Sequence, residues 1–380
     1  MTLSKKIFIA STVIFLTALL FWGVYSLVFN KNSANLLKDT DIKNSMSGSS
    51  EQSGRNVPKG KISPISQDSV ISPILKSDGV TIVYYSSQNG QVFQIDLDGN
   101  NKKQVADKTL LGLERVLWSP DQTKVLSQFQ GRKFSYYSYE ENRGAPLNQS
   151  IKSANFQNDQ KIVYSFLDPA TNKSSINVSD WDGENWKKLT DIDFYGQEIV
   201  PVPRSGLVSF WNSPGANFET RLYSLPIIGG DKKLLFSGKF GADYLWNHSG
   251  SQLLVSASNE KGGRKINLGL LDSQGQNYQD LSLPTFVSKC IWSKDGKTVY
   301  YALPGAMPSD VVLPDDYVQE KFKTTDTFWR MDISTGKKER IVELSDIKDK
   351  IDAKNLFFNS DESLLFFVNR YDGRIWRIQL

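Results

Sequence analysis

The sequence repeats itself at intervals near 43 residues, and this repeat constrains the fold more than any other feature. Each unit has an apolar, usually aromatic residue, then a polar turn, then a run rich in β-branched and aromatic residues. The clearest copies begin at Trp118 (WSPDQTKVLSQF), Trp246 (WNHSGSQLLVSAS) and Trp292 (WSKDGKTVYYAL). The turn position three residues later holds Asp78, Asp121, Asp159, Ser205, Ser249, Asp295 and Asp361. The intervals are 43, 38, 46, 44, 46 and 66 residues, so the last one marks an insertion.

Every unit also contains further β-rich runs, and a glycine-bearing turn usually separates the last two of them. A period of about 40–45 residues with four short strands is typical of a β-propeller. The sequence therefore predicts an all-β fold over residues 61–380, a seven-bladed β-propeller of four-stranded antiparallel blades. The repeated aromatic residues are expected to end the innermost strands and to be buried between neighbouring blades as a structural core. They are Trp118, Phe156, Trp246, Trp292 and Phe358.

The seventh unit stops before its outer strand, because the run that ends at Leu380 is its third. Residues 61–66 (KISPIS) precede the first unit and have the composition of an outer strand. We expect residues 61–66 to supply the outer strand of the last blade by pairing with residues 374–380. Such pairing ties the last blade to the first and covers a strand edge that would otherwise be exposed.

The combination of W-S-P-D-G-like turns with D-L-D-G-like turns (residues 96–99 and 180–183) resembles the TolB-type, WD-repeat-like β-propeller family. The resemblance covers nearly all of the chain after Lys61, and it implies the propeller fold. It implies little about function, since this fold carries many unrelated activities. TolB itself has an α/β domain before its propeller, and this chain has an apolar segment in that place, so a TolB role is not carried over.

Residues 7–29 form a stretch of 23 residues without a charge. A helix of that length, at about 1.5 Å per residue, spans the roughly 30 Å hydrocarbon core of a bilayer. Lys5 and Lys6 precede the stretch, so the positive-inside rule predicts a cytoplasmic tail at residues 1–6 and the propeller on the extracytoplasmic side of the cytoplasmic membrane. The alternative is a cleaved signal peptide, which has a shorter apolar region and an A-x-A-like site. Residues 30–60 are polar and are expected to be a flexible linker.

The composition excludes several kinds of site. There is one cysteine, Cys290, and one histidine, His248, so neither a disulfide framework nor a histidine-cluster metal site is expected. The net charge of +4 is too small and dispersed to indicate nucleic-acid binding. No G-x-S-x-G motif occurs, and the acidic D-x-D-G sequences fit β-turns better than calcium loops. We therefore expect no enzyme activity, no cofactor and no metal.

Residues 304–325 form the insertion in the sixth unit, and long connections are disproportionately functional. It carries Met307, Val311, Leu313, Tyr317 and Phe322 among acidic residues, a mixture that suits exposed anchors for a protein partner. Trp211 and Phe218 lie on a loop expected at the same face. The alternative is that the insertion folds over the channel and plugs it.

These features favour a membrane-anchored, extracytoplasmic β-propeller that acts as a protein-interaction or scaffold module of the cell envelope. The alternative is a carbohydrate- or cell-wall-binding module on the same scaffold, with a glycan as partner. The third and least favoured hypothesis is a hydrolase or lyase with its active site in the central channel.

Overall fold

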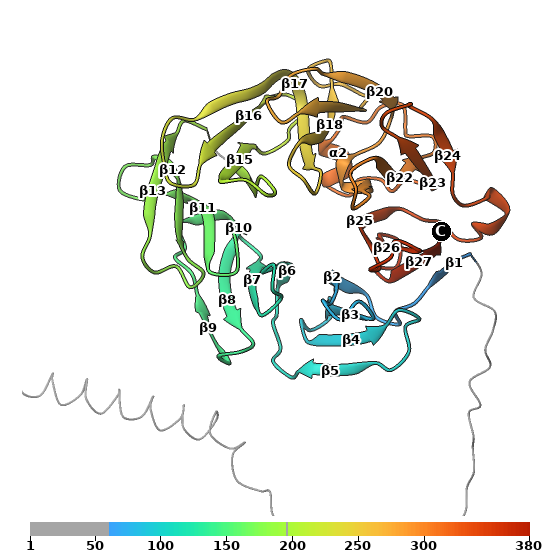
Figure 1. Ribbon diagram of the computed structural model, residues 1–380, viewed down its shortest axis with the longest axis horizontal. Coiled ribbons are helices and arrows are strands. Elements are labelled where there is room, and N and C mark those ends of the chain that lie inside the picture. The colour runs from blue at the N-terminus through green and yellow to red at the C-terminus, as the bar shows by residue number, and fades with distance from the viewer. Residues whose placement is uncertain (1–60, 195–196) are drawn as a thin grey trace, which may run out of the picture. The chain divides into compact units, whose positions relative to one another are not determined.

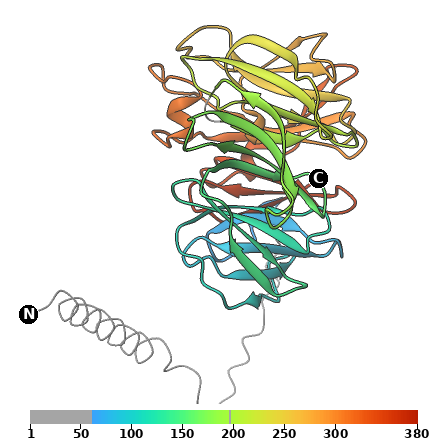
Figure 2. The same cartoon turned by 90° about the vertical axis from the view of Figure 1, so that its left-hand side faces the viewer.

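The computed structural model describes residues 61–194 and 197–380, which belong to one compact unit of the chain. This part is built of antiparallel β-sheets that radiate around a centre (Figure 1) and twist from one face to the other (Figure 2). None of the helices in the described residues has the length and apolar character needed to cross a membrane. The predicted tail at residues 1–6, membrane segment at 7–29 and linker at 30–60 lie outside the described residues.

In the described part, five sheets have four strands each and one has seven. The first sheet is β2 (Val70–Leu75), β3 (Thr81–Ser86), β4 (Val92–Asp96) and β5 (Lys103–Ala106). The second is β6 (Leu113–Trp118), β7 (Lys124–Phe129), β8 (Lys133–Ser138) and β9 (Arg143–Pro146). The third is β10 (Ile151–Phe156), β11 (Lys161–Leu167), β12 (Ser174–Asp180) and β13 (Lys187–Ile192).

The seven-stranded sheet follows, with β14 (Gln197–Pro201), β15 (Leu207–Asn212), β16 (Glu219–Pro226), β17 (Lys233–Trp246), β18 (Gln252–Ser258), β19 (Asn267–Asp272) and β20 (Gln279–Leu283). Next come β21 (Cys290–Trp292), β22 (Thr298–Pro304), β23 (Asp326–Asp332) and β24 (Lys338–Arg340). The last sheet is β25 (Ala353–Phe358), β26 (Leu364–Asn369), β27 (Ile375–Gln379) and β1 (Ile62–Pro64). The described helices are short: α2 (Asp315–Val318) and the 3-10 helices η1 (Val287–Lys289) and η2 (Leu344–Asp346).

The sequence of each unit explains its strand order. The second strand of a repeat, such as β3 or β18, is almost fully buried, because neighbouring repeats cover both of its faces. The outer strand β5 is largely exposed. The turn between the first two strands is held by its aspartate, since Asp78 Oδ1 accepts the backbone N–H groups of Val80 and Thr81 at 2.9 Å each. In Figure 1 the first strands β2, β6, β10 and β25 surround the centre, and β5, β9, β13 and β24 lie at the periphery.

The long strand β17 explains the seven-stranded sheet. Its first part, from Lys233 to Phe240, pairs with β16, and its second part, from Phe240 to Trp246, pairs with β18. The outer strand of one repeat thus continues without a break into the inner strand of the next. The register shifts on both sides of this strand, as expected where a strand bends from one sheet position to another.

The strand β1 lies beside the last strand of the chain. Ile62, Ser63 and Pro64 pair antiparallel with Ile378, Arg377 and Trp376. Ile65 N–H donates to the Ile375 carbonyl at 2.8 Å, which extends the contact past the strand. The two ends of the repeat region are therefore joined in one sheet.

The repeated aromatic residues lie in the contacts between sheets. Phe156, Trp246, Trp292 and Phe358 are buried, and Trp118 is half-buried. The indole N–H of Trp246 donates to Ser209 Oγ at 2.9 Å, and that of Trp292 to the Leu245 carbonyl at 3.3 Å. The indole rings of Trp246 and Trp292 thus pack against the preceding repeat, and each indole N–H finds its hydrogen-bond acceptor there.

Candidate functional site

The insertion between β22 and β23 folds onto the body of the protein. Val311, Leu313 and Tyr317 are buried in one cluster with Ile266 and Phe286, and Met307 and Phe322 pack against its edge. The Leu313 N–H donates to the Gly263 carbonyl at 3.0 Å, and Asp315 Oδ1 accepts the Ala216 N–H at 2.8 Å. The insertion therefore contacts the loop of Trp211 and Phe218, which the sequence placed on the same face, and also the loop that contains Gly263.

This packing corrects the expectation that the insertion exposes a row of anchors. Leu313 is 0% exposed and Tyr317 is 6% exposed, because these apolar side chains gain more by covering the propeller's own surface than by facing water. Trp211 is also buried, and its indole N–H donates to Asp243 Oδ1 at 3.2 Å. Of the seven predicted contact residues, Phe218 is the one with a largely exposed ring.

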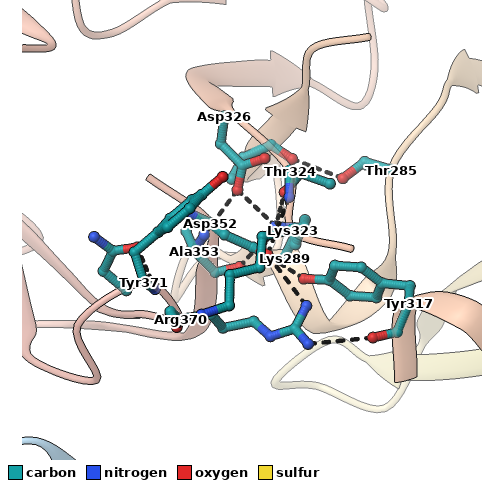
Figure 3. A network of polar contacts seen from close by, with 12 residues as sticks. Thr285, Lys289, Tyr317, Lys323, Thr324, Asp326, Asp352, Ala353, Arg370 and Tyr371 are labelled. Atoms are coloured by element: carbon teal, nitrogen blue, oxygen red, sulfur yellow. Dashed lines mark hydrogen bonds and ion pairs between the residues drawn. The ribbon is translucent and has the colours of Figure 1, made fainter. Parts of the chain in front are cut away.

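A network of buried charges lies directly beneath the insertion (Figure 3). Lys289 is the last residue of η1, and its ammonium donates to Asp326 Oδ2 and to Asp352 Oδ1, both at 2.6 Å. All three side chains are 0% exposed. The ammonium also donates to Thr324 Oγ1 at 3.0 Å and to the Ala353 carbonyl at 3.1 Å, so every proton of this cation faces an acceptor.

Tyr317 and Arg370 connect this network to the insertion. The Tyr317 hydroxyl donates to Asp352 Oδ1 at 2.7 Å, and Arg370 donates to Asp352 Oδ2 and to the Tyr317 carbonyl, both at 3.2 Å. The Arg370 guanidinium also lies 4.2 Å from the centre of the Tyr317 ring, within cation–π distance. The hydroxyl, the ring and the carbonyl of Tyr317 thus hold the helix α2 against Asp352 and Arg370 (Figure 3).

The two aspartates have different environments. Burial disfavours the ionised form of Asp352, but Lys289 and the hydrogen bonds to its oxygens outweigh this and lower its pKa. At Asp326 burial prevails over Lys289 and raises the pKa, and Asp326 Oδ1 has no hydrogen-bond partner among the described residues. Burial also opposes the charge on Lys289, yet the attraction of Asp326, Tyr317 and Asp352 raises its pKa to about 12.

A pocket of about 250 Å³ adjoins the network on the side of the channel. The insertion lines it with Pro314, Tyr317 and Glu320, and β17, η1 and β25 contribute Asp243, Ser288 and Lys354, respectively. Gly241 lies under the insertion with φ +58°, and a Cβ at this position would lie 2.3 Å from Pro314 Cδ. Glycine is therefore required for the close approach of the insertion at this point.

A larger apolar groove lies between the sheets β2–β5 and β6–β9. Its volume is about 580 Å³, and its lining includes Leu110, Leu111, Phe129, Tyr136, Tyr137 and Tyr139. Leu111 is 75% exposed at its mouth. Lys108 and Lys133 also line the groove, while its lining contains no Asp or Glu.

The sequence interpretation missed the residues of the buried network and the pocket. A signal for some of them was present, because the residue three positions before the repeated apolar residue is often polar. Such residues include Ser72, Arg115, Ser153, Asp243, Lys289 and Asn355. Two of these, Asp243 and Lys289, hold buried or half-buried charges in the structure.

No protein-family model matches the chain, and no curated protein matches it by sequence. Its fold matches an oligogalacturonate lyase in complex with manganese, at 13% identity and TM-score 0.58, over 85% of this chain and 98% of that one. It also matches the β-propeller domain of Cps50 (Swd1) from Myceliophteria thermophila, at 13% identity and TM-score 0.53, over 84% and 99%. TolB from Acinetobacter baumannii matches at 14% identity and TM-score 0.42, over 76% of this chain and 59% of TolB, a likeness too distant to inform function.

Within residues 61–194 and 197–380, no group of three or more His, Cys, Asp or Glu side chains is placed to hold a metal ion. Identities of this size show a shared fold and not a shared activity. The comparisons and the sheet topology together assign the described chain to the β-propeller fold.

Proposed function

We propose that the protein is a non-catalytic interaction module of the cell envelope. Residues 7–29 anchor it in the cytoplasmic membrane, and the propeller on the extracytoplasmic side binds a protein partner. The propeller has seven blades in this proposal, with the seven-stranded sheet counted as two blades that share β17. The division of β17 between β16 and β18 supports that count.

The apolar groove between the sheets β2–β5 and β6–β9 is the observation that carries the proposal. Its aromatic lining and the exposed Leu111 offer apolar contact area of the kind that dominates protein interfaces. Because Lys108 and Lys133 are the charged residues of the lining, we propose that the partner inserts an extended segment with apolar and acidic side chains.

A photo-crosslinking residue at position 111 is expected to capture a defined envelope protein in intact cells, whereas the same residue at Ile228 is not. Ile228 is the matched control, since it is a similarly exposed aliphatic residue (79%) in the turn between β16 and β17. A peptide from the captured protein should bind the purified full-length chain, and Lys108→Glu with Lys133→Glu should weaken that binding at least tenfold. Acid-to-lysine changes in the peptide should restore it. Identical captured proteins from both positions, or no effect of the lysine changes, would contradict the proposal.

The same cells test the membrane placement. A maleimide that does not cross the cytoplasmic membrane should label Leu111→Cys in intact cells and should label the parent chain weakly, because its single cysteine, Cys290, is buried. Labelling of Leu111→Cys that requires cell lysis would place the propeller in the cytosol and reject this part of the proposal.

A carbohydrate-binding function is the second candidate, and Trp186 favours it. This indole is 66% exposed and lines a pocket of about 460 Å³ together with Asp182, Glu184, Asn148 and Tyr164. An exposed ring beside carboxylate and amide groups suits a sugar, because its C–H face packs on the ring and its hydroxyls reach the polar atoms.

Trp186→Ala is expected to abolish any binding to a glycan array, while Phe218→Ala is not. Phe218 is the control, since its ring is exposed to a similar degree (71%) at a different site. The absence of any glycan bound by the parent chain, or equal binding by both variants, would remove this candidate.

A further inference from the structure

Lys354 differs from the other cations around the insertion. It is half-buried in β25 and lines the pocket of about 250 Å³ at the channel. No hydrogen bond or ion pair joins its ammonium to any residue within 61–194 and 197–380, whereas Lys289 has four acceptors. Arg370 is bound to Asp352 and also pairs with Glu320 at 3.3 Å.

Charges of both signs surround Lys354, but neither carboxylate near it forms an ion pair with its ammonium. Burial lowers its pKa most and Arg370 lowers it next, Glu320 and Asp352 oppose this, and Lys323 adds the smallest lowering effect. Lys323 donates to the Arg370 carbonyl at 2.8 Å, which keeps these two cations together. Because burial and Arg370 outweigh the two carboxylates, the charged form of Lys354 is disfavoured, and an anion bound to its ammonium would offset that cost.

Other residues that line the pocket carry groups that accept and donate hydrogen bonds. Asp243 is held by the indole N–H of Trp211 at 3.2 Å and by its contact with the Tyr244 N–H at 3.0 Å. Burial first, and then the charge of Glu198, raises the pKa of Asp243 to about 7, so both of its protonation states are available near neutral pH. Ser256 and Ser288 line the same pocket.

We propose that this pocket binds a small organic anion that carries hydroxyl groups, with its charged group on Lys354 and its hydroxyls on Asp243 and the two serines. A cavity of about 150 Å³ already holds benzene, so about 250 Å³ suits a ligand no larger than one sugar ring. The charged group is a carboxylate or a phosphate, since both pair with an ammonium. The site is separate from the groove and does not depend on the function proposed above.

Calorimetric titration of the full-length, detergent-purified chain tests the proposal. We expect D-glucuronate or glycerol 1-phosphate to bind, and the uncharged D-glucose and glycerol not to bind. Preference for the first or the second anion identifies the charged group as carboxylate or phosphate. Lys354→Gln should weaken binding at least tenfold, and Lys337→Gln, a change at an exposed lysine elsewhere, should not.

A second variant separates loss of the site from loss of the fold. Asp243→Asn should retain binding of the anion but reduce the preference for D-glucuronate over acetate, because it alters the wall that contacts the hydroxyls. Unchanged binding by Lys354→Gln overturns the proposal, as does the failure of the parent chain to bind either anion.

Discussion

Lys289→Met is expected to lower the free energy of unfolding by about 3–5 kcal/mol, the usual cost of removing one partner from a buried ion pair. Methionine fills most of the space but leaves Asp326 and Asp352, both 0% exposed, without their shared cation. Urea denaturation followed by tryptophan fluorescence measures the loss. Limited proteolysis should also become faster within residues 305–325, because Tyr317 is bound to Asp352.

Charge balance provides the control for this variant. Adding Asp326→Asn to Lys289→Met should recover part of the stability, since it removes the carboxylate left without a cation while Asp352 stays paired with Arg370. Lys337→Met changes the same residue type at an exposed position and should have little effect. If Lys289→Met were as stable as the parent chain, the buried network would not be what holds the insertion.

The pH dependence of the same pair of proteins gives an independent check. The pKa of Lys289 is raised from 10.5 to about 12 in the folded state, so its contribution is fully present below pH 10.5 and is lost as the pH rises through about 12. The difference in stability between the parent chain and Lys289→Met should therefore be constant from pH 7 to 10 and shrink above that range. A difference that grows with rising pH would have the wrong sign for this pairing.

The sheets could be predicted from the sequence because their signals are local and repeated. A turn aspartate such as Asp78 bonds to backbone groups two and three residues ahead, and a run such as residues 81–86 is apolar on both faces. Both properties appear in a window of about ten residues, and each copy of the repeat reinforces the others.

The insertion and its network could not be predicted in the same way. A segment with Val311, Leu313 and Tyr317 has the composition of an exposed contact surface and equally that of a loop that buries itself, and the choice depends on which surface of the propeller lies below it. The partners of Lys289 are 37 and 63 residues away in the chain, so no local pattern links them. The polar residue three positions before the repeated apolar residue identifies positions such as Asp243 and Lys289, where a charge can be buried. It does not identify the residues that pair with that charge.

The double change Ile62→Ala and Ile65→Ala is expected to produce the second large loss of stability. Ile62 is buried in the cluster that contains Trp376, and Ile65 in the separate cluster that contains Tyr84. Each change should cost about 2–5 kcal/mol, and the two losses should add because the side chains belong to different clusters. Urea and thermal unfolding midpoints should both fall, and deletion of residues 61–66 should lower the thermal midpoint by several degrees or more.

Lys61→Ala is the matched control, since that side chain is exposed and its carbonyl keeps the hydrogen bond from Gln379 N–H at 2.9 Å. The decisive measurement is which strands show faster amide hydrogen exchange in the double variant. If β1 closes the ring, amide exchange in the double variant should rise both in β27, with which β1 pairs, and in β3 and β4, which pack against Ile65. The strand β1 ends at Pro64 and β3 begins at Thr81, whereas β27 is separated from β1 by the whole propeller. Faster exchange confined to the first sheet would therefore indicate a local contact. Faster exchange in both sheets requires that the beginning and the end of the propeller support each other.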